Sequence, residues 1–147
     1  MTESIKREIV VPQPPEQVWQ ALTNSATLAE WMFPNDIEPT VGHRFTFQVP
    51  GDPKGKFDGL VVRCEVLECK PPARLVFAWS AGGAVEDTRV TFLLEPADEG
   101  TRILFEHSGF DVSAEFGEQA FQGAKFGWAK MLGKLSSVLA GSQPGEL

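Results

Sequence analysis

The sequence predicts an α+β fold, in which a curved antiparallel sheet of about six strands wraps on one long C-terminal helix. Apolar and polar residues alternate in short segments separated by turn residues, which is typical of antiparallel strands with one buried face. Over residues 113–139 the apolar residues recur at helical spacing, and a helix of that length is about 40 Å long. No other predicted element is long enough to cover the sheet, so we expect this helix to lie across it.

The beginning of the chain predicts one strand followed by two short helices. Apolar residues alternate over residues 5–11, which favours a strand. Pro14 and Pro15 open a helix, because a proline in the first helical turn loses no backbone hydrogen bond. Residues 24–25 end this helix and cap a second one, which ends before Pro34.

Further strand-like segments follow, each bounded by turn residues. They cover residues 43–49, 57–69, 75–79, 88–94 and 103–107. The proline- and glycine-rich residues between them, at 50–55, 71–72, 82–83 and 95–100, favour chain reversals. Short turns between alternating segments predict that consecutive strands pair antiparallel.

Composition limits the classes of function. The net charge of −7 repels phosphate backbones, so we expect no nucleic-acid partner. No apolar run is long enough to span a membrane, and no secretory signal opens the chain, so we expect a cytoplasmic protein. The cysteines and histidines lack the spacing of a metal site, and a hairpin turn explains the acidic residues 86–87 beside two glycines. We expect neither a metal nor a cofactor.

A chain of 147 residues has the size of one domain, which we expect to span residues 1–141, with residues 142–147 as a flexible tail. Cys64 and Cys69 lie in one predicted strand. Their odd separation in a regular strand predicts side chains on opposite faces, about 16 Å apart, which is too far for a disulfide. We expect Cys64 to be a small core residue.

Several segments, taken in order, resemble the START-like (SRPBCC) superfamily, whose fold is called helix-grip. They are residues 14–23 (PPEQVWQALT), 28–31 (LAEW), 66–79, 90–96, 107–110 and 127–128, with Leu132 and Leu135. Within it, the chain is similar to the branch named for the activator of heat-shock-protein-90 ATPase, homologue-1-like. The resemblance covers residues 5–140 and implies the helix-grip fold. It implies no single activity, since members include lipid and polyketide binders, cyclases and co-chaperone domains.

Strand parity predicts an inner sheet face that is rich in aromatic side chains. An apolar cavity with a few polar groups is the usual site for a small molecule, and a filled core is the alternative interpretation. The candidate ligand-binding residues on the sheet and the facing helices are Trp31, Phe45, Phe47, Val62, Phe77, Trp79, Phe92, Phe105, His107, Phe121, Trp128 and Leu132. Because the chain has no tyrosine, we expect an apolar ligand that is lipid-like or aromatic.

His107 is the one candidate catalytic residue, because its parity points it into the predicted cavity. A histidine there can orient a ligand or act as a general base. The alternative is a hydrogen-bonded core histidine. Glu106 and Ser108 have the opposite parity, while Asp58 and Glu68 share the inner parity but lie near strand ends. The residues therefore favour a binding protein over an enzyme.

Phe126 falls on the side of the long helix that faces away from the sheet. It is either a single exposed apolar residue or part of a surface for a protein partner or a second copy of the chain. Gly123 and Gly127 lie at the edge of the apolar stripe, where they either permit close approach to other elements or leave space for a ligand.

Three functional hypotheses follow. The first is a binding protein that holds an apolar small molecule between the sheet and the C-terminal helix. The second is a protein-interaction module of co-chaperone type, which acts through the surface around Phe126. The third is an enzyme, such as a cyclase or dehydratase, that uses His107 as an acid or base.

Overall fold

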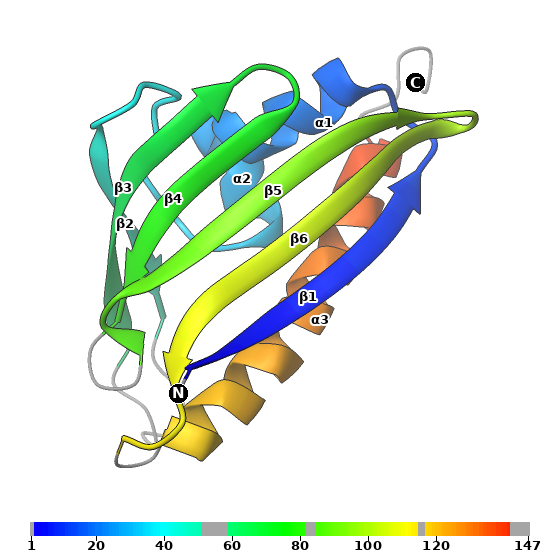
Figure 1. Ribbon diagram of the computed structural model, residues 1–147. Helices are drawn as coiled ribbons and strands as arrows, with labels where there is room; N and C mark the ends of the chain where they lie inside the picture. Colours follow the sequence, from blue (N-terminus) through cyan, green and yellow to red (C-terminus); the bar gives the residue numbers. More distant parts are fainter. Residues whose placement is uncertain (1, 51–58, 82–84, 115–116, 142–147) are drawn as a thin grey trace.

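The computed structural model describes residues 2–50, 59–81, 85–114 and 117–141 (Figure 1). In chain order its elements are β1 (Thr2–Val11), α1 (Pro15–Thr23), α2 (Ser25–Trp31), β2 (Arg44–Val49), β3 (Leu60–Lys70), β4 (Arg74–Ser80), β5 (Thr88–Ala97), β6 (Gly100–Asp111) and α3 (Gly117–Gly141). The predicted α+β class and the order of elements are confirmed. The predicted tail, residues 142–147, lies outside the described residues, as does Asp58.

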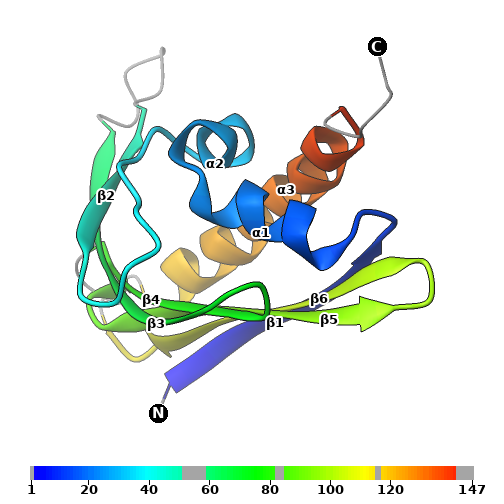
Figure 2. The ribbon, with the colours of Figure 1, turned by 90° about the horizontal axis from the view of Figure 1, so that it is seen from above.

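The strands form one six-stranded sheet in the order β1-β6-β5-β4-β3-β2. Each strand from β2 to β5 pairs antiparallel with the next along the chain, and β1 pairs antiparallel with β6 at one edge. The sheet curves, and all three helices lie within its concave side (Figure 2). On that side α1 and α3 both contact the sheet, and both short helices contact α3.

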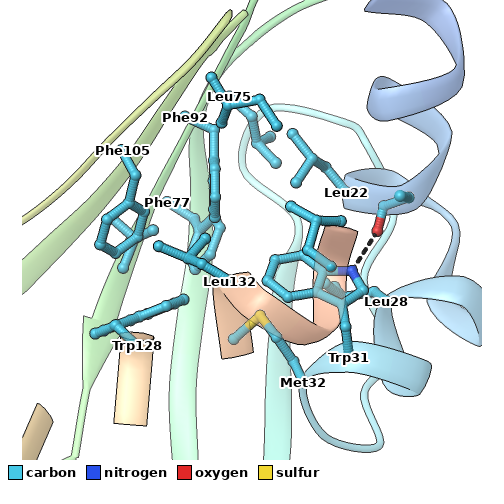
Figure 3. Close-up of a cluster of buried hydrophobic side chains, with 14 of the residues drawn as sticks. Leu22, Leu28, Trp31, Met32, Leu75, Phe77, Phe92, Phe105, Trp128 and Leu132 are labelled. Carbon is cyan, nitrogen blue, oxygen red and sulfur yellow. Dashed lines mark hydrogen bonds between the residues drawn. The ribbon is translucent and has the colours of Figure 1, made fainter. Parts of the chain in front are cut away.

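The two short helices are joined by a cap and by a buried hydrogen bond. Pro15 stands in the first turn of α1, as predicted. The side chain of Asn24 accepts a hydrogen bond from the backbone of Thr27 and so caps α2. Nε1 of Trp31 donates to the backbone oxygen of Ala21 at 2.9 Å (Figure 3). This bond fixes the indole of α2 against α1.

The long helix α3 has 25 residues, which corresponds to about 37 Å. Its buried face carries the predicted stripe, which comprises Phe121, Trp128, Leu132, Leu135 and Leu139. The predicted start near residue 113 is wrong, because Oδ1 of Asp111 accepts hydrogen bonds from the backbone and hydroxyl of Ser113. That local turn competes with helix formation. The helix begins at Gly117, where a Cβ would lie 2.3 Å from the Asp111 carbonyl oxygen.

A β-bulge in β3 changes the parity of the strand. Val66 lies opposite Phe77, whereas Glu68, two residues on, lies opposite Val76. The extra residue reverses the alternation of faces. Glu68 is therefore on the outer face, where its carboxylate accepts from Nε of Arg74 at 3.1 Å, and the inner parity predicted for Glu68 is wrong.

The same bulge changes the relation between the two cysteines. Cys64 lies opposite Trp79 and Cys69 lies opposite Leu75, so both cysteines share the inner parity. The prediction that they point to opposite faces is wrong, since it assumed a regular strand. Both are free thiols, and burial raises the pKa of the Cys64 thiol well above its usual value.

The glycines inside α3, after its first residue Gly117, do not serve close packing. A Cβ built at Gly123, Gly127 or Gly133 meets no atom of a described neighbour within 4 Å. The interpretation that Gly123 and Gly127 permit a close approach to the sheet or the short helices is therefore wrong.

Gly133→Ala should raise the free energy of unfolding by about 0.5–1 kcal/mol, because alanine loses less backbone freedom than glycine in an exposed helix. Urea denaturation followed by circular dichroism measures the change. As the matched control, Gly117→Ala should lower the stability, since its Cβ collides with the Asp111 backbone. A loss of stability in Gly133→Ala would contradict the open surroundings of this position.

Candidate ligand site

Trp128 of α3 extends from that helix toward aromatic rings of the sheet (Figure 3). Its ring centroid is 4.4 Å from that of Phe105, 5.6 Å from that of Trp79 and 6.5 Å from that of Phe92. These side chains come from β6, β4 and β5, so one indole contacts rings of three strands. Such tilted and edge-to-face ring pairs stabilise a core beyond their buried area.

The ring contacts continue across the sheet to β2. Phe45 lies 5.5 Å from Phe47 and 5.5 Å from Phe77, measured between ring centroids. On the other side, Trp31 of α2 meets Phe92 edge-on at 6.1 Å. A continuous layer of rings therefore extends from the edge strand β2 to β6 and up to α2. We call this layer the aromatic interior.

The structure places every candidate ligand-binding residue in or beside the aromatic interior. None is more than 8% exposed: Trp31, Phe45, Phe47, Val62, Phe77, Trp79, Phe92, Phe105, His107, Phe121, Trp128 and Leu132. Figure 3 shows the rings of Phe77, Phe92 and Trp128 directed toward one another. That these residues bind a ligand stays a prediction.

His107 joins α3 to the sheet through a chain of buried hydrogen bonds. Nε1 of Trp128 donates to Nδ1 of His107 at 2.9 Å. Nε2 of His107 lies 2.8 Å from the hydroxyl of Thr88, which in turn donates to the backbone oxygen of Trp79 at 2.6 Å. The side chains of His107, Thr88 and Trp128 are each at most 3% exposed.

The donor at one end of the chain and the acceptor at the other fix the tautomer of His107. An indole N–H only donates, so Nδ1 must accept. The Thr88 proton is used on the Trp79 carbonyl, so the hydroxyl oxygen accepts from Nε2. His107 is therefore neutral with its proton on Nε2. Burial lowers the pKa of His107 to about 3, in agreement with this state.

Sequence reasoning did not identify the partners of His107. Thr88 shares the inner parity of Val90 and Phe92, and that parity was the signal that could have found it. Trp128 was treated as an apolar residue, although its indole carries a donor. In this arrangement the basic nitrogen of His107 is occupied by the indole N–H, so the ring does not face a substrate as a general base.

Two surface hollows lie outside the aromatic interior. One, of about 500 Å³, lies on the outer sheet face and includes Lys6, Arg74, Leu93 and Glu106. The other, of about 550 Å³, lies beside β2 and β3 and includes Val49. Neither hollow is lined by a described residue of α3. Buried side chains of the protein fill the space between α3 and the sheet.

Phe126 lies on the opposite side of α3 from Trp128 and is 75% exposed. Among the described residues, no group of three or more His, Cys, Asp or Glu side chains is placed to hold a metal ion. Within the same residues, no helix has both the length and the apolar character needed to cross a membrane.

Residues 12–140 match the family model described as Activator of Hsp90 ATPase homolog 1-like protein. The chain belongs to this family. The resemblance inferred from the sequence segments is thereby confirmed, and the helix-grip arrangement of sheet and α3 is that of the START-like proteins. No curated protein matches the chain.

Solved structures share the fold of this chain. Protein MLL2253 from Mesorhizobium loti is 33% identical over 96% of this chain and 99% of its own, with a TM-score of 0.81. BH1534 from Bacillus halodurans is 26% identical over 93% of this chain and 96% of its own, with a TM-score of 0.75. DynU16, described as a putative protein in the dynemicin biosynthetic locus, is 26% identical over 96% of this chain and 48% of its own, with a TM-score of 0.76.

The buried neutral state of His107 predicts a loss of stability in mild acid. The pKa of His107 lies near 3 in the folded protein and near 6.5 in the unfolded chain, so only the unfolded chain takes up the proton between these values. Stability is therefore complete above the unfolded pKa and decreases as the pH falls through this window. We expect the free energy of unfolding to decrease by about 2 kcal/mol between pH 7 and pH 5.

Urea denaturation at a series of pH values measures this decrease, and His107→Gln should remove most of it. The matched control is His43→Gln, because His43 is the other histidine and lies near the surface. Glu68 and Asp111, whose pKa values are lowered by their hydrogen-bond partners, act only at more acidic pH. An unchanged slope in His107→Gln would contradict the buried neutral ring.

Proposed function

We propose that this protein binds a neutral, apolar small molecule, lipid-like or aromatic, between the sheet and α3. The observation that carries the proposal is the aromatic interior. Rings from β2, β4, β5, β6, α2 and α3 meet there in one layer, and the layer contains a single polar chain at His107. Apolar walls with a few converging polar groups are the common composition of small-molecule sites.

The charge distribution supports a neutral ligand. Among the described residues, the buried polar side chains are Gln13, Thr23, Thr88, Thr101 and His107, and no Asp, Glu, Lys or Arg side chain is buried. Transfer of an ion from water into such an interior costs several kcal/mol when the interior holds no opposite charge. A charged compound is therefore a poor occupant.

Binding requires that the interior open, because its own side chains fill it in this structure. We infer that the protein exchanges between this closed state and a state in which α3 or its side chains make room. A ligand that binds only the open state shifts that equilibrium by its own binding free energy. DynU16, to which this chain is similar, is described as a putative protein in the dynemicin biosynthetic locus, which is consistent with handling of a small organic molecule.

We propose further that residues 1–141 act as one domain and that the protein works in the cytoplasm. Neither point alters the site, since every residue of the aromatic interior lies within that range.

Thermal denaturation with a panel of aromatic compounds and fatty acids tests the proposed function. A ligand present at about 100 times its Kd should stabilise the folded protein by about 2.7 kcal/mol, which shifts Tm by several degrees. Phe92→Leu, which alters the aromatic interior, should weaken the shift, whereas the surface variant Phe126→Ala should retain it. If no compound of either class raises Tm, the proposed function is wrong.

A second candidate function is action on a chaperone through the outer side of α3. The observation in its favour is Phe126, a ring that is 75% exposed on a helix turn beside the small residue Gly123. The family is named for activators of the Hsp90 ATPase. Exposed aromatic residues of this kind are frequent anchors at protein interfaces.

ATP hydrolysis by a purified Hsp90-type chaperone tests this second candidate. The wild-type protein should raise the hydrolysis rate. Phe126→Asp should not, because a carboxylate at position 126 opposes burial of this part of α3 against the chaperone. Ser136→Asp, which adds the same charge to another exposed position of α3, serves as the matched control and should still raise it. If wild type and Phe126→Asp raise the rate of ATP hydrolysis equally, the surface around Phe126 does not act on the chaperone.

A further inference from the structure

The hydrogen-bond chain through the aromatic interior has one direction. Every proton points away from α3: from the Trp128 indole to His107, from His107 to Thr88, and from Thr88 to the Trp79 carbonyl. The chain ends on a backbone oxygen, which only accepts. Its entrance on the side of α3 is therefore an acceptor, Nδ1 of His107, that requires a donor.

Trp128 is the side chain that an incoming ring would displace. It stands between α3 and the sheet and contacts the rings of Trp79, Phe105 and His107. Its indole N–H donates to another side chain, whereas the indole N–H of Trp31 donates to the backbone of α1. The inner rings of β4, β5 and β6 are held by the strand ladders on both sides, so a movement of α3 carries Trp128 away and leaves them in place.

Displacement of Trp128 leaves Nδ1 of His107 without a donor in a place that water does not reach, since His107 is only 1% exposed. A buried acceptor without a partner is costly, so an occupant that lacks a donor binds poorly. An occupant with a suitably placed N–H or O–H restores the whole chain. The vacated slot is lined by flat rings, which favour a flat occupant.

We propose that the site selects neutral, flat aromatic compounds with one N–H or O–H donor, such as indoles and phenols, which replace the Trp128 indole at Nδ1 of His107. This inference rests on the proposed function, which by itself would admit any apolar compound. It assigns His107 the role of a specificity-determining acceptor and Trp128 the role of an internal substitute for the ligand.

Trp128→Ala provides the direct test, because it empties a slot of the size of an indole. Binding of indole and of benzothiophene to this variant is measured by isothermal titration calorimetry. The two compounds have nearly the same shape, but benzothiophene has a sulfur in place of the N–H and is the more apolar. We expect indole to bind at least about tenfold more tightly. Burial of apolar surface alone would give the reverse order.

Two further variants serve as controls. Phe77→Ala opens a slot among Phe45, Phe47 and Phe92, none of which takes part in the hydrogen-bond chain, and should show no preference for indole. In the Trp128→Ala background, His107→Phe removes the acceptor and should abolish the preference. If Trp128→Ala binds benzothiophene as tightly as indole, or keeps its preference without His107, the inference is overturned.

The wild-type protein provides a second measurement that does not depend on the folding of a cavity variant. 2-Naphthol should bind at least about tenfold more tightly than 2-methoxynaphthalene, which lacks the donor. Comparable affinities overturn the inference and leave the proposed function intact. If wild type binds neither compound, the inference is overturned as well, and the proposed function is then decided by the thermal denaturation panel.

Discussion

The hydrogen bond from the Trp128 indole to His107 is the directional contact between α3 and β6, and the arrangement of the interior depends on it. Apart from the Gln17 amide on the backbone oxygen of Leu139 and the Lys125 ammonium over the Phe121 ring, the α3 stripe makes apolar contacts. Apolar surfaces tolerate sliding and rotation far better than a buried hydrogen bond does. A shift of α3 by one residue would leave the N–H of Trp128 and Nδ1 of His107 without partners inside the protein. The bond therefore sets the register of the helix on the sheet, and with it the position of every ring that faces α3.

The same interaction explains why a histidine is compatible with an apolar core. Both ring nitrogens of His107 have a partner, and its neutral form matches the donors and acceptors around it. This satisfied state makes His107 poorly suited to take a proton from a substrate, which counts against the enzyme hypothesis. It makes His107 well suited to select a ligand, because the loss of a donor at Nδ1 changes the binding free energy without screening by water.

Much of this arrangement could be predicted from the sequence, because strand alternation and helical spacing report which faces are apolar. The stripe around Trp128 and the inner faces of β4, β5 and β6 follow from that periodicity. The position of Glu68 did not, since a β-bulge in β3 reverses the parity and leaves no clear mark in the residue pattern. The start of α3 was missed because Asp111 and Ser113 form a local turn that outcompetes the helix.

The candidate site was predictable in its residues and not in its bonding. Strand parity places His107 on the inner face. Periodicity does not predict that Thr88 and Trp128 bond to its two ring nitrogens, because this pairing depends on how β5 and α3 are arranged in space. Periodicity likewise does not distinguish an open cavity from the closed layer of rings seen here. That difference depends on side-chain volume in three dimensions.

The measurement that tests this account most directly is ¹⁵N NMR of the His107 imidazole in the wild-type protein, followed from about pH 7 to about pH 5. The account predicts a neutral ring with its proton on Nε2 throughout this range, and a Trp128 indole N–H that is protected from exchange with water. A ring protonated on Nδ1, or one that titrates near the ordinary histidine pKa of 6.5, would contradict it.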